Sequence, residues 1–367
     1  MKILFISFFN GELKSGGNVC SNRNFKSLKS IYGEGNVFLF PISRAKKGIK
    51  ENKLIWNLKN IFVDVFGLGF GGLNNSHKRQ IMGRINELNI DVVFIDSSLL
   101  GVLSMKIKKE LPKIKIVTFF HNVEYSFFCQ DIIEEKKYFL FYRILLAYIS
   151  ERLACKYSDK IITLNQRDDI QINSIYNRKS NIQIPISLEN KYNSISQDTP
   201  SKVKVGLFVG SFFFPNIQGI KWFIKNVLPF VDMELNIVGK DMDQLNQDIL
   251  VQDSSNIIVH SSVPNLTEYY EKADFVILPI FLGGGMKVKT AEALMYGKFL
   301  LGTKEAFVGY EIGDNIGLCC DTPNEMINGI NCFNRKSKYN IESKQLFLEK
   351  YSFESTLNKF QMLFSSL

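Results

Sequence analysis

Residues 281–297, FLGGGMKVKTAEALMYG, hold three glycines, two lysines and a glutamate directly after the apolar run ADFVILPI. The glycines are Gly283, Gly284 and Gly285. They leave backbone N–H groups uncovered at the start of a helix, which we expect to begin near Met286, to run for about eleven residues and to end at Gly297. A helix N-terminus carries about half a positive charge and unpaired donors, and a cation there is unfavourable alone. The position of Lys287 therefore predicts a phosphate between its side chain and the helix.

The same stretch can also be an ordinary glycine-rich turn between a strand and a helix, with lysines on its surface. Lys289 and Glu292 are three residues apart on the predicted helix, share a face and can form an ion pair. Three glycines and a charge placed against the helix dipole exceed what a turn needs. We therefore favour a phosphate site in which Lys287 is the main cation and Lys289 contributes less.

Strand and helix patterns alternate on both sides of this stretch. Apolar runs of four to eight residues between helical patterns are typical of parallel sheets built from βαβ units. The predicted strands of the first half are 2–9, 36–42, 90–98, 113–121 and 159–165. Those of the second half are 203–211, 233–240, 255–263, 274–280 and 299–303. The predicted helices include 77–88, 134–158, 217–231, 265–273 and 352–367.

A polar segment without apolar periodicity, residues 187–204, divides the two series of elements and indicates a linker. We expect an α/β fold of two Rossmann-like parallel-sheet domains. The expected parts are an N-terminal domain (1–190), a linker (191–204), a C-terminal domain (205–350) and a C-terminal helix that returns to the N-terminal domain (351–367). Open parallel sheets bind ligands at the carboxyl ends of their strands, so we expect the site in a cleft between the domains.

The positive charge of the chain is concentrated in its first half. Residues 1–200 contain 29 Lys and Arg against 18 Asp and Glu, a net +11, and residues 201–367 contain 16 against 18, a net −2. This asymmetry favours an anionic partner for the first half, although a lysine-rich surface without a special partner explains it as well. The six cysteines form no C-x-x-C pair, which indicates reduced structural thiols in the cytoplasm.

The segment LPIFLGGGMKVKTAEALMYGKFLLGT (278–303) resembles the donor-site segment of bacterial retaining glycosyltransferases of family 4, which have the two-domain GT-B fold. The resemblance implies that Lys287 contacts the diphosphate of a nucleotide-sugar donor, that Lys289 is the second basic residue, and that Glu292 binds the ribose hydroxyls. This family often carries another glutamate eight residues before that one. Here this position is Gly284, so the sugar must be held by another group.

The segment GLFVGSFFFPNIQGIKWFIKNVLP (206–229) resembles the beginning of the donor domain in the same family. Many relatives carry basic residues toward the phosphates where this chain has Ser211 and Asn216, so neutral donors and backbone amides take over part of their role. The donor-binding residues that the resemblance implies beyond Lys287 and Glu292 are Gly16, Gly17, Gly210, Ser211, Asn216, Val263, Gly283, Gly284, Gly285 and Met286.

In the first half, Gly16 and Gly17 follow the first predicted strand, as the glycine loop of the family does. His121, Asn122 and Glu124 follow the fourth predicted strand. The resemblance implies that His121 contacts the donor sugar, and Asn122 and Glu124 are candidates for binding the sugar or the acceptor. A buried or helix-capping histidine is the alternative interpretation of His121.

The resemblance implies an enzyme that transfers a sugar from a nucleotide-diphosphate sugar to a hydroxyl of a glycan or lipid-linked glycan. We expect retention, catalysis by Lys287 and His121, no cofactor and no metal, in the synthesis of lipopolysaccharide, O-antigen or capsule. The basic segments 44–53 and 105–115 and the aromatic helix 136–157 fit a cytoplasmic protein that associates peripherally with an anionic inner membrane. A nucleotide-sugar epimerase of the same fold and a nucleic-acid-binding protein are the alternatives, but no nucleic-acid-binding motif is present, and we expect no nucleic-acid partner.

Overall fold

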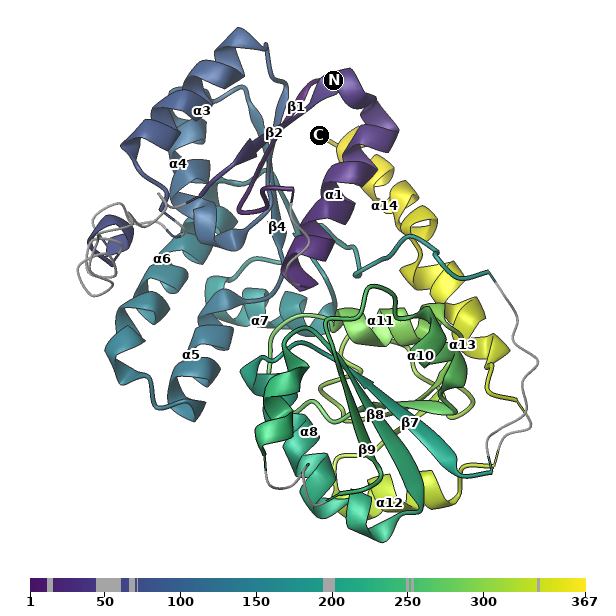
Figure 1. Ribbon diagram of the computed structural model, residues 1–367. Helices are drawn as coiled ribbons and strands as arrows, with labels where there is room; N and C mark the ends of the chain where they lie inside the picture. The colour runs from purple at the N-terminus through teal and green to yellow at the C-terminus, as the bar shows by residue number, and fades with distance from the viewer. Residues whose placement is uncertain are drawn as a thin grey trace. The chain divides into compact units, whose positions relative to one another are not determined.

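We analysed a computed structural model, which describes residues 1–11, 16–43, 61–65, 70, 72–193, 202–248, 251, 254–334 and 337–367. The chain forms two compact units (Figure 1). Unit 1 comprises Met1–Pro185 and Thr356–Leu367, and unit 2 comprises Ile186–Ser355. The basic segment 44–53 and most of the predicted linker lie outside the described residues.

Unit 1 is built on a parallel six-stranded sheet with the order β2-β1-β3-β4-β5-β6. Its strands are β1 (Ile3–Ser7), β2 (Val37–Pro41), β3 (Val92–Ile95), β4 (Lys115–Phe120), β5 (Lys160–Thr163) and β6 (Ile182–Gln183). Its helices are α1 (Gly16–Tyr32), α3 (Asn75–Glu87), α4 (Gly101–Glu110), α5 (Glu124–Glu134), α6 (Phe141–Tyr157), α7 (Gln166–Tyr176) and most of α14 (Phe353–Ser365).

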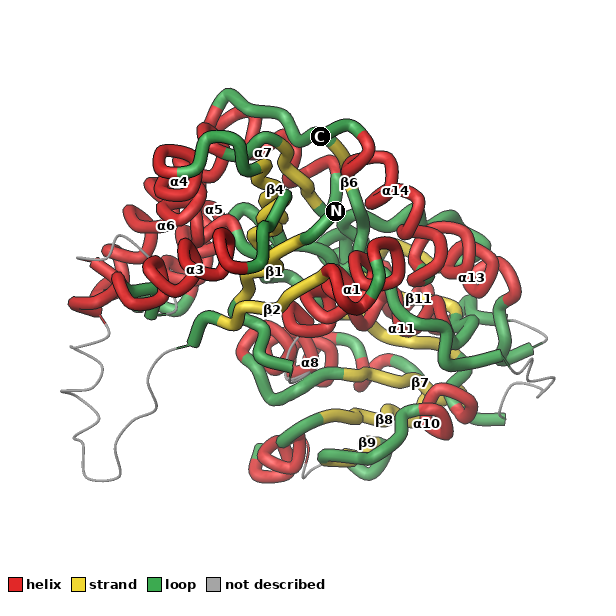
Figure 2. Tube along the Cα trace, turned by 90° about the horizontal axis from the view of Figure 1, so that it is seen from above, coloured by secondary structure: helices red, strands yellow, loops and turns green. Residues whose placement is uncertain are grey.

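Helices cover both faces of this sheet, so its strands are apolar on both sides. Successive side chains of a strand point to opposite faces. Leu4 and Ile6 of β1 pack in one core cluster with residues of α3 and α4. Phe94 of β3 instead stacks on Phe364 of α14, and Phe5 contacts Phe25 of α1. Figure 2 shows α3, α4 and α6 on one side of these strands and α1 and α14 on the other.

The single helix predicted over 134–158 is wrong. The chain forms α5, which ends at Glu134, a short 3-10 turn at Tyr138–Leu140, and α6, which begins at Phe141. Lys136 separates them because its φ of 53° is left-handed and cannot continue a right-handed helix. The sequence does not reveal this break, because apolar residues continue from the end of α5 through the 3-10 turn into α6.

Unit 2 is built on a second parallel sheet, with the order β12-β11-β10-β7-β8-β9. Its strands are β7 (Lys204–Val209), β8 (Met233–Gly239), β9 (Ile257–Ser261), β10 (Phe275–Leu278), β11 (Phe299–Gly302) and β12 (Gly317–Cys319). Its helices are α8 (Phe214–Asn226), α10 (Thr267–Lys272), α11 (Val288–Met295), α12 (Pro323–Asn331) and α13 (Ile341–Leu346). The two predicted parallel sheets are therefore confirmed. No helix in the described part of the chain is both long and apolar enough to cross a membrane.

Candidate active site

The glycine-rich turn follows β10, whose four residues are all buried. Gly283 and Gly285 have φ angles of 128° and 61°, which side chains other than glycine rarely adopt. Lys287 is extended and caps α11, which has eight residues and begins at Val288. The expected start near Met286 and the length of about eleven residues are therefore wrong, because the turn continues to Lys287. Gly297, with a φ of 61°, follows the end of the helix as predicted.

Lys287 is folded back onto this turn. Its Nζ donates to the carbonyl oxygens of Gly283, Gly284 and Gly285 at 3.4, 3.3 and 3.1 Å. It also forms an ion pair with Glu305 Oε1 at 2.7 Å, in which both side chains are largely buried. A glutamate that follows β11 thus partly neutralises the charge of Lys287.

Lys289 does not pair with Glu292 as the spacing allowed. Its Nζ donates to Asn216 Oδ1 at 2.6 Å and lies 4.8 Å from the ring centroid of Phe208. A side-chain carbon on Gly210 would come within 3.2 Å of the same Nζ, so the absence of a side chain there leaves room for the lysine. Burial, and the positive charge of Lys287, lower the pKa of Lys289 to about 7. Lys289 therefore lies at the carboxyl end of β7 as a second cation that is short of negative partners.

Asn216 links Lys289 to the loop after β7. Its Nδ2 donates to the carbonyl oxygen of Ser211 at 2.9 Å, and its Oδ1 accepts from Lys289. The amide that the sequence suggested as a neutral phosphate donor therefore orients a lysine.

Glu292 lies about one turn after Lys289 on α11. Tyr270 OH donates to its Oε2 at 3.2 Å. Tyr270 in turn stacks on Tyr296, with ring centroids 4.1 Å apart and planes at 8°. Burial raises the pKa of Glu292. Val263, the predicted base contact, follows Ser262, whose left-handed φ of 53° turns the chain after β9.

In unit 1, the predicted residues lie at the carboxyl ends of β1 and β4. Gly16 is the first residue of α1 and Gly17 the second. His121 follows β4, and its Nε2 lies 3.1 Å from the carbonyl oxygen and 3.3 Å from Oδ1 of Asp96, which follows β3. The negative charges of Asp96 and Cys20 hold the pKa of His121 well above 6.5, although burial acts in the opposite direction.

Glu124 is the first residue of α5, and the buried Glu151 of α6 caps this helix. Glu151 Oε1 accepts from the backbone N–H of Glu124 at 2.8 Å, and Oε2 accepts from that of Tyr125 at 3.2 Å. Ser98 Oγ and Tyr176 OH also donate to this carboxylate. Burial raises the pKa of Glu151 to about 7, and burial with the charge of Glu151 raises that of Glu124 to about 8. Asn122, between His121 and Glu124, has a buried Oδ1 without a hydrogen-bond partner in the described part of the chain.

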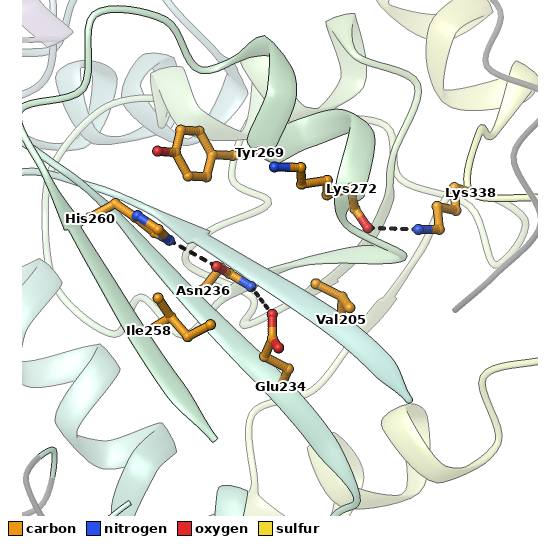
Figure 3. A pocket seen from close by; sticks show the side chains of 8 residues that line it. All are labelled: Val205, Glu234, Asn236, Ile258, His260, Tyr269, Lys272 and Lys338. Carbon is orange, nitrogen blue, oxygen red and sulfur yellow. Dashed lines mark hydrogen bonds between the residues drawn. The ribbon is translucent and has the colours of Figure 1, made fainter. Parts of the chain in front are cut away.

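A pocket of about 380 Å³ in unit 2 contains none of the predicted site residues. It lies over β7, β8 and β9 beside α10 (Figure 3) and is lined by Val205, Glu234, Asn236, Ile258, His260, Tyr269, Lys272 and Lys338. His260 Nε2 contacts Asn236 Oδ1 at 3.1 Å, and Asn236 Nδ2 donates to Glu234 at 2.7 Å. These polar groups thus satisfy one another along the open face of the sheet.

The sequence interpretation missed Asp96, Glu151 and Glu305. Asp96 could have been found, because a carboxylate directly after a buried strand of a parallel sheet is a recognisable signal. Glu151 lies inside a helical pattern and Glu305 inside a loop, so nothing in their spacing connects them to His121 or Lys287.

Part of this chain is similar to known proteins. Residues 203–333 match the family described as Glycosyl transferases group 1. This segment extends from β7 to just beyond α12 and contains Lys287, Lys289 and Glu292. A protein of Klebsiella pneumoniae, described as an uncharacterized 44.6 kDa protein in the cps region, is 31% identical over 109 residues. The match covers 26% of this chain and spans only 28% of that relative.

Solved structures share the fold over the whole chain. Sucrose-phosphate synthase from Thermosynechococcus elongatus has a TM-score of 0.73 at 12% identity, covering 100% of this chain and 99% of that one. The lipopolysaccharide outer core galactosyltransferase WaaB has a TM-score of 0.66 at 14% identity, covering 100% of both chains. HepE from Anabaena, in complex with UDP and glucose, gives the same TM-score, identity and coverage.

At these identities the structural similarity establishes the fold, which is the GT-B fold of glycosyltransferases. On this fold, residues 203–333 match the Glycosyl transferases group 1 family.

Proposed function

We propose that the protein transfers a sugar from a nucleotide-diphosphate sugar to a hydroxyl of a glycan or lipid-linked glycan. One observation carries this proposal: within the segment that matches the glycosyl transferase family, Lys287 and Lys289 lie beside the strand ends where an open parallel sheet binds ligands. Glu292 lies on the same helix as an acceptor for ribose hydroxyls. HepE was solved with UDP and UDP-glucose, which makes uridine nucleotides the first donors to test.

Sugar transfer passes through an oxocarbenium-like state while negative charge develops on the departing diphosphate. Positive groups that are already in place stabilise this charge best. In our proposal, Lys287 and Lys289 supply this stabilisation without a metal. Reaction with retention fits because the departing phosphate can assist deprotonation of the acceptor on the same face of the sugar. Turnover that survives EDTA, and a product with the anomeric configuration of the donor, are the expected results.

The binding test compares the intact protein with UDP, GDP, ADP, CMP and oligonucleotides by thermal shift. We expect stabilisation by one nucleoside diphosphate, which Lys287→Ala removes and Lys289→Ala reduces to a smaller extent. Lys272→Ala is the matched control, because this exposed lysine pairs only along its own helix with Glu268 in the described residues. Stabilisation by no nucleotide contradicts the transferase proposal, and stabilisation by oligonucleotides alone supports a nucleic-acid-binding protein. Conversion of the nucleotide-sugar to an epimer without an acceptor supports an epimerase.

We further propose a role in bacterial surface polysaccharide synthesis, including capsule, O-antigen or lipopolysaccharide. The similarity to a protein of a cps region and the shared fold with a lipopolysaccharide galactosyltransferase support it. Mass detection of transferred sugar on lipid-diphosphate-linked acceptors tests this assignment. Transfer only to soluble acceptors outside this class would contradict it.

We also propose that unit 1 contacts an anionic membrane through the tip that joins α5 to α6, which we call the hairpin tip. Its exposed apolar side chains are Ile133 (59%), Tyr138 (53%), Phe139 (78%), Phe141 (54%) and Leu145 (61%). Tyr142 and Leu146 of the predicted membrane helix instead pack in the core of unit 1. Apolar side chains at this exposure fit insertion at the headgroup level, and the basic first half adds electrostatic attraction.

Sedimentation with phosphatidylglycerol vesicles tests the hairpin tip. Phe139→Ser should weaken binding several-fold, whereas Phe230→Ser, an exposed phenylalanine of unit 2, should leave it unchanged. Salt at about 0.5 M, well beyond the concentration that screens surface charges, should also weaken it. Equal effects of both variants, or binding that does not respond to salt, would contradict the proposal.

A further inference from the structure

Four ionisable side chains of alternating charge lie next to one another in unit 1. They are Asp96 after β3, His121 after β4, and Cys20 and Arg23 on α1. His121 Nε2 lies 3.3 Å from Asp96 Oδ1, and Arg23 Nη2 donates to Cys20 Sγ at 3.4 Å. The charges of Cys20 and His121 also act on each other, which joins the two pairs.

Arg23 is the least ordinary member of this cluster, because it is only 4% exposed. Its guanidinium lies 5.8 Å from the ring centroid of Phe119 and 5.5 Å from that of Phe360. Its Nε and Nη1 have no hydrogen-bond partner, and within the described ranges no carboxylate forms an ion pair with it. A buried cation needs a nearby anion, and aromatic rings compensate only part of its lost hydration. The polar side chain that the guanidinium contacts is the thiol of Cys20.

At the other end of the cluster, hydrogen bonds hold the carboxyl group of Asp96 in place. It is fully enclosed, and Ser7 Oγ and Asn24 Nδ2 each donate to one of its oxygens at 2.8 Å. An anion with these donors favours a proton on the adjacent imidazole.

We propose that Cys20 is a thiolate held between Arg23 and His121, and that Cys20 and Asp96 together fix His121 as an imidazolium. Cys20 is then a positioning residue, which acts through His121. The part that this plays in sugar transfer rests on the proposed function, whereas the ionic states themselves do not.

The other charges near the cluster agree with this assignment. Arg23 and His121 lower the pKa of Cys20 although burial acts to raise it. Glu124 of α5 is the next acidic group that senses His121, and Glu151 of α6 lies behind Glu124. An imidazolium donates hydrogen bonds and cannot accept a proton. His121 therefore suits an oxygen of the sugar or of the departing phosphate, and does not suit the role of a general base.

Nuclear magnetic resonance of isotope-labelled histidine tests the ionic states directly, because the chain has only three histidines. In the intact protein, we expect His121 to titrate well above 6.5, and Cys20→Ser should lower its midpoint by about one pH unit. Cys155→Ser is the matched control: Cys155 is also buried, but burial and the charge of Glu151 raise its pKa to about 12. A midpoint near 6.5 in the intact protein, or an unchanged midpoint in Cys20→Ser, would overturn the proposal.

The ultraviolet absorbance of thiolates gives a second readout that does not require the Cys20→Ser variant to fold. The intact protein should contain one thiolate at neutral pH, and Arg23→Gln should remove it. If thiolate absorbance is absent at neutral pH, the proposal fails. In the activity assay, Cys20→Ser should shift the alkaline limb of the pH profile to lower pH. If Cys20→Ser shifts the titration midpoint of His121 but not the pH profile of activity, only the role in sugar transfer is overturned. The titration of His121 can still be measured if the protein has no transferase activity, so the two proposals fail separately.

Discussion

In the proposed donor site, the ion pair between Lys287 and Glu305 sets how much positive charge a bound diphosphate would meet. Glu305→Gln removes the competing anion but keeps the shape of the side chain. We expect UDP to bind about tenfold more tightly, equivalent to about 1.4 kcal/mol, as measured by calorimetry. Glu311→Gln is the control, because Glu311 pairs with Lys350 in the same unit. Weaker binding of the nucleotide-sugar by Glu305→Gln, with unchanged binding of UDP, would instead show that Glu305 holds the sugar in place of the glutamate missing at Gly284.

A different prediction concerns Lys289, because burial and the positive charge of Lys287 lower its pKa to about 7. At about pH 8 most of the unliganded protein has a neutral Lys289, and a diphosphate beside it favours the charged form. Binding of UDP should therefore take up close to one proton, which calorimetry in buffers of different ionisation enthalpy measures. Lys289→Met should abolish this uptake. Uptake that persists in Lys289→Met would place the titrating group elsewhere.

For single residues, the sequence predicted positions along a helix but not the contacts that those residues make with other elements. The spacing placed Lys289 and Glu292 on one face of a helix, but it could not show that Asn216, from α8, lies against Lys289. Lys287 was predicted as a cation at a helix N-terminus, and its position as the N-cap of α11 agrees with this. Its partner Glu305 was not predictable, because that contact depends on how the loop after β11 folds over the turn.

Among the elements, the turn between β10 and α11 depends most on its backbone. Gly285 has a left-handed φ of 61°, so Gly285→Ala should destabilise the protein by about 1–2 kcal/mol. The change should also displace a carbonyl that accepts from Lys287 and weaken UDP binding. Gly284→Ala is the control for stability, because Gly284 is not among the glycines with positive φ. Equal unfolding midpoints of the two variants in urea would contradict this prediction.

The elements themselves were largely predictable because buried parallel strands are recognisable as short apolar runs. All ten predicted strands correspond to strands of the structure, whereas β6 and β12, with two and three residues, are too short for a pattern. Helix ends were less predictable, since the break at Lys136 and the late start of α11 depend on the backbone angles of single residues.

Across the whole molecule, burial shifts the pKa values of carboxyl groups most in unit 1 and those of lysines most in unit 2. Unit 1 holds Glu124 and Glu151, whose pKa values burial raises to about 8 and about 7. Unit 2 holds Lys289 and Lys344, whose pKa values burial lowers to about 7 and about 8. The formal charge of the sequence does not reveal this division, because it counts every carboxyl as charged and every lysine as protonated.

These pKa shifts predict that the stability of the two units changes in opposite directions when the pH rises from about 7 to about 9. In unit 1, folded Glu124 keeps its proton to higher pH than the unfolded chain does, so the folded state binds more protons and loses stability as pH rises through about 8. In unit 2, folded Lys289 and Lys344 release protons that the unfolded chain still binds, so stability rises over the same window. Hydrogen exchange, corrected for the intrinsic pH dependence of exchange, should therefore show faster opening of α5 and slower opening of α11.

Two variants separate these contributions from a general effect of pH. Glu124→Gln should reduce the trend in α5 and leave that in α11, because its amide does not titrate. Lys289→Met should reduce the trend in α11 and leave that in α5, and it should stabilise unit 2 more at about pH 7 than at about pH 9, because the costly ammonium is more populated at the lower pH. If both helices open faster at about pH 9, or if both trends persist in the variants, the pH response comes from groups other than Glu124 and Lys289.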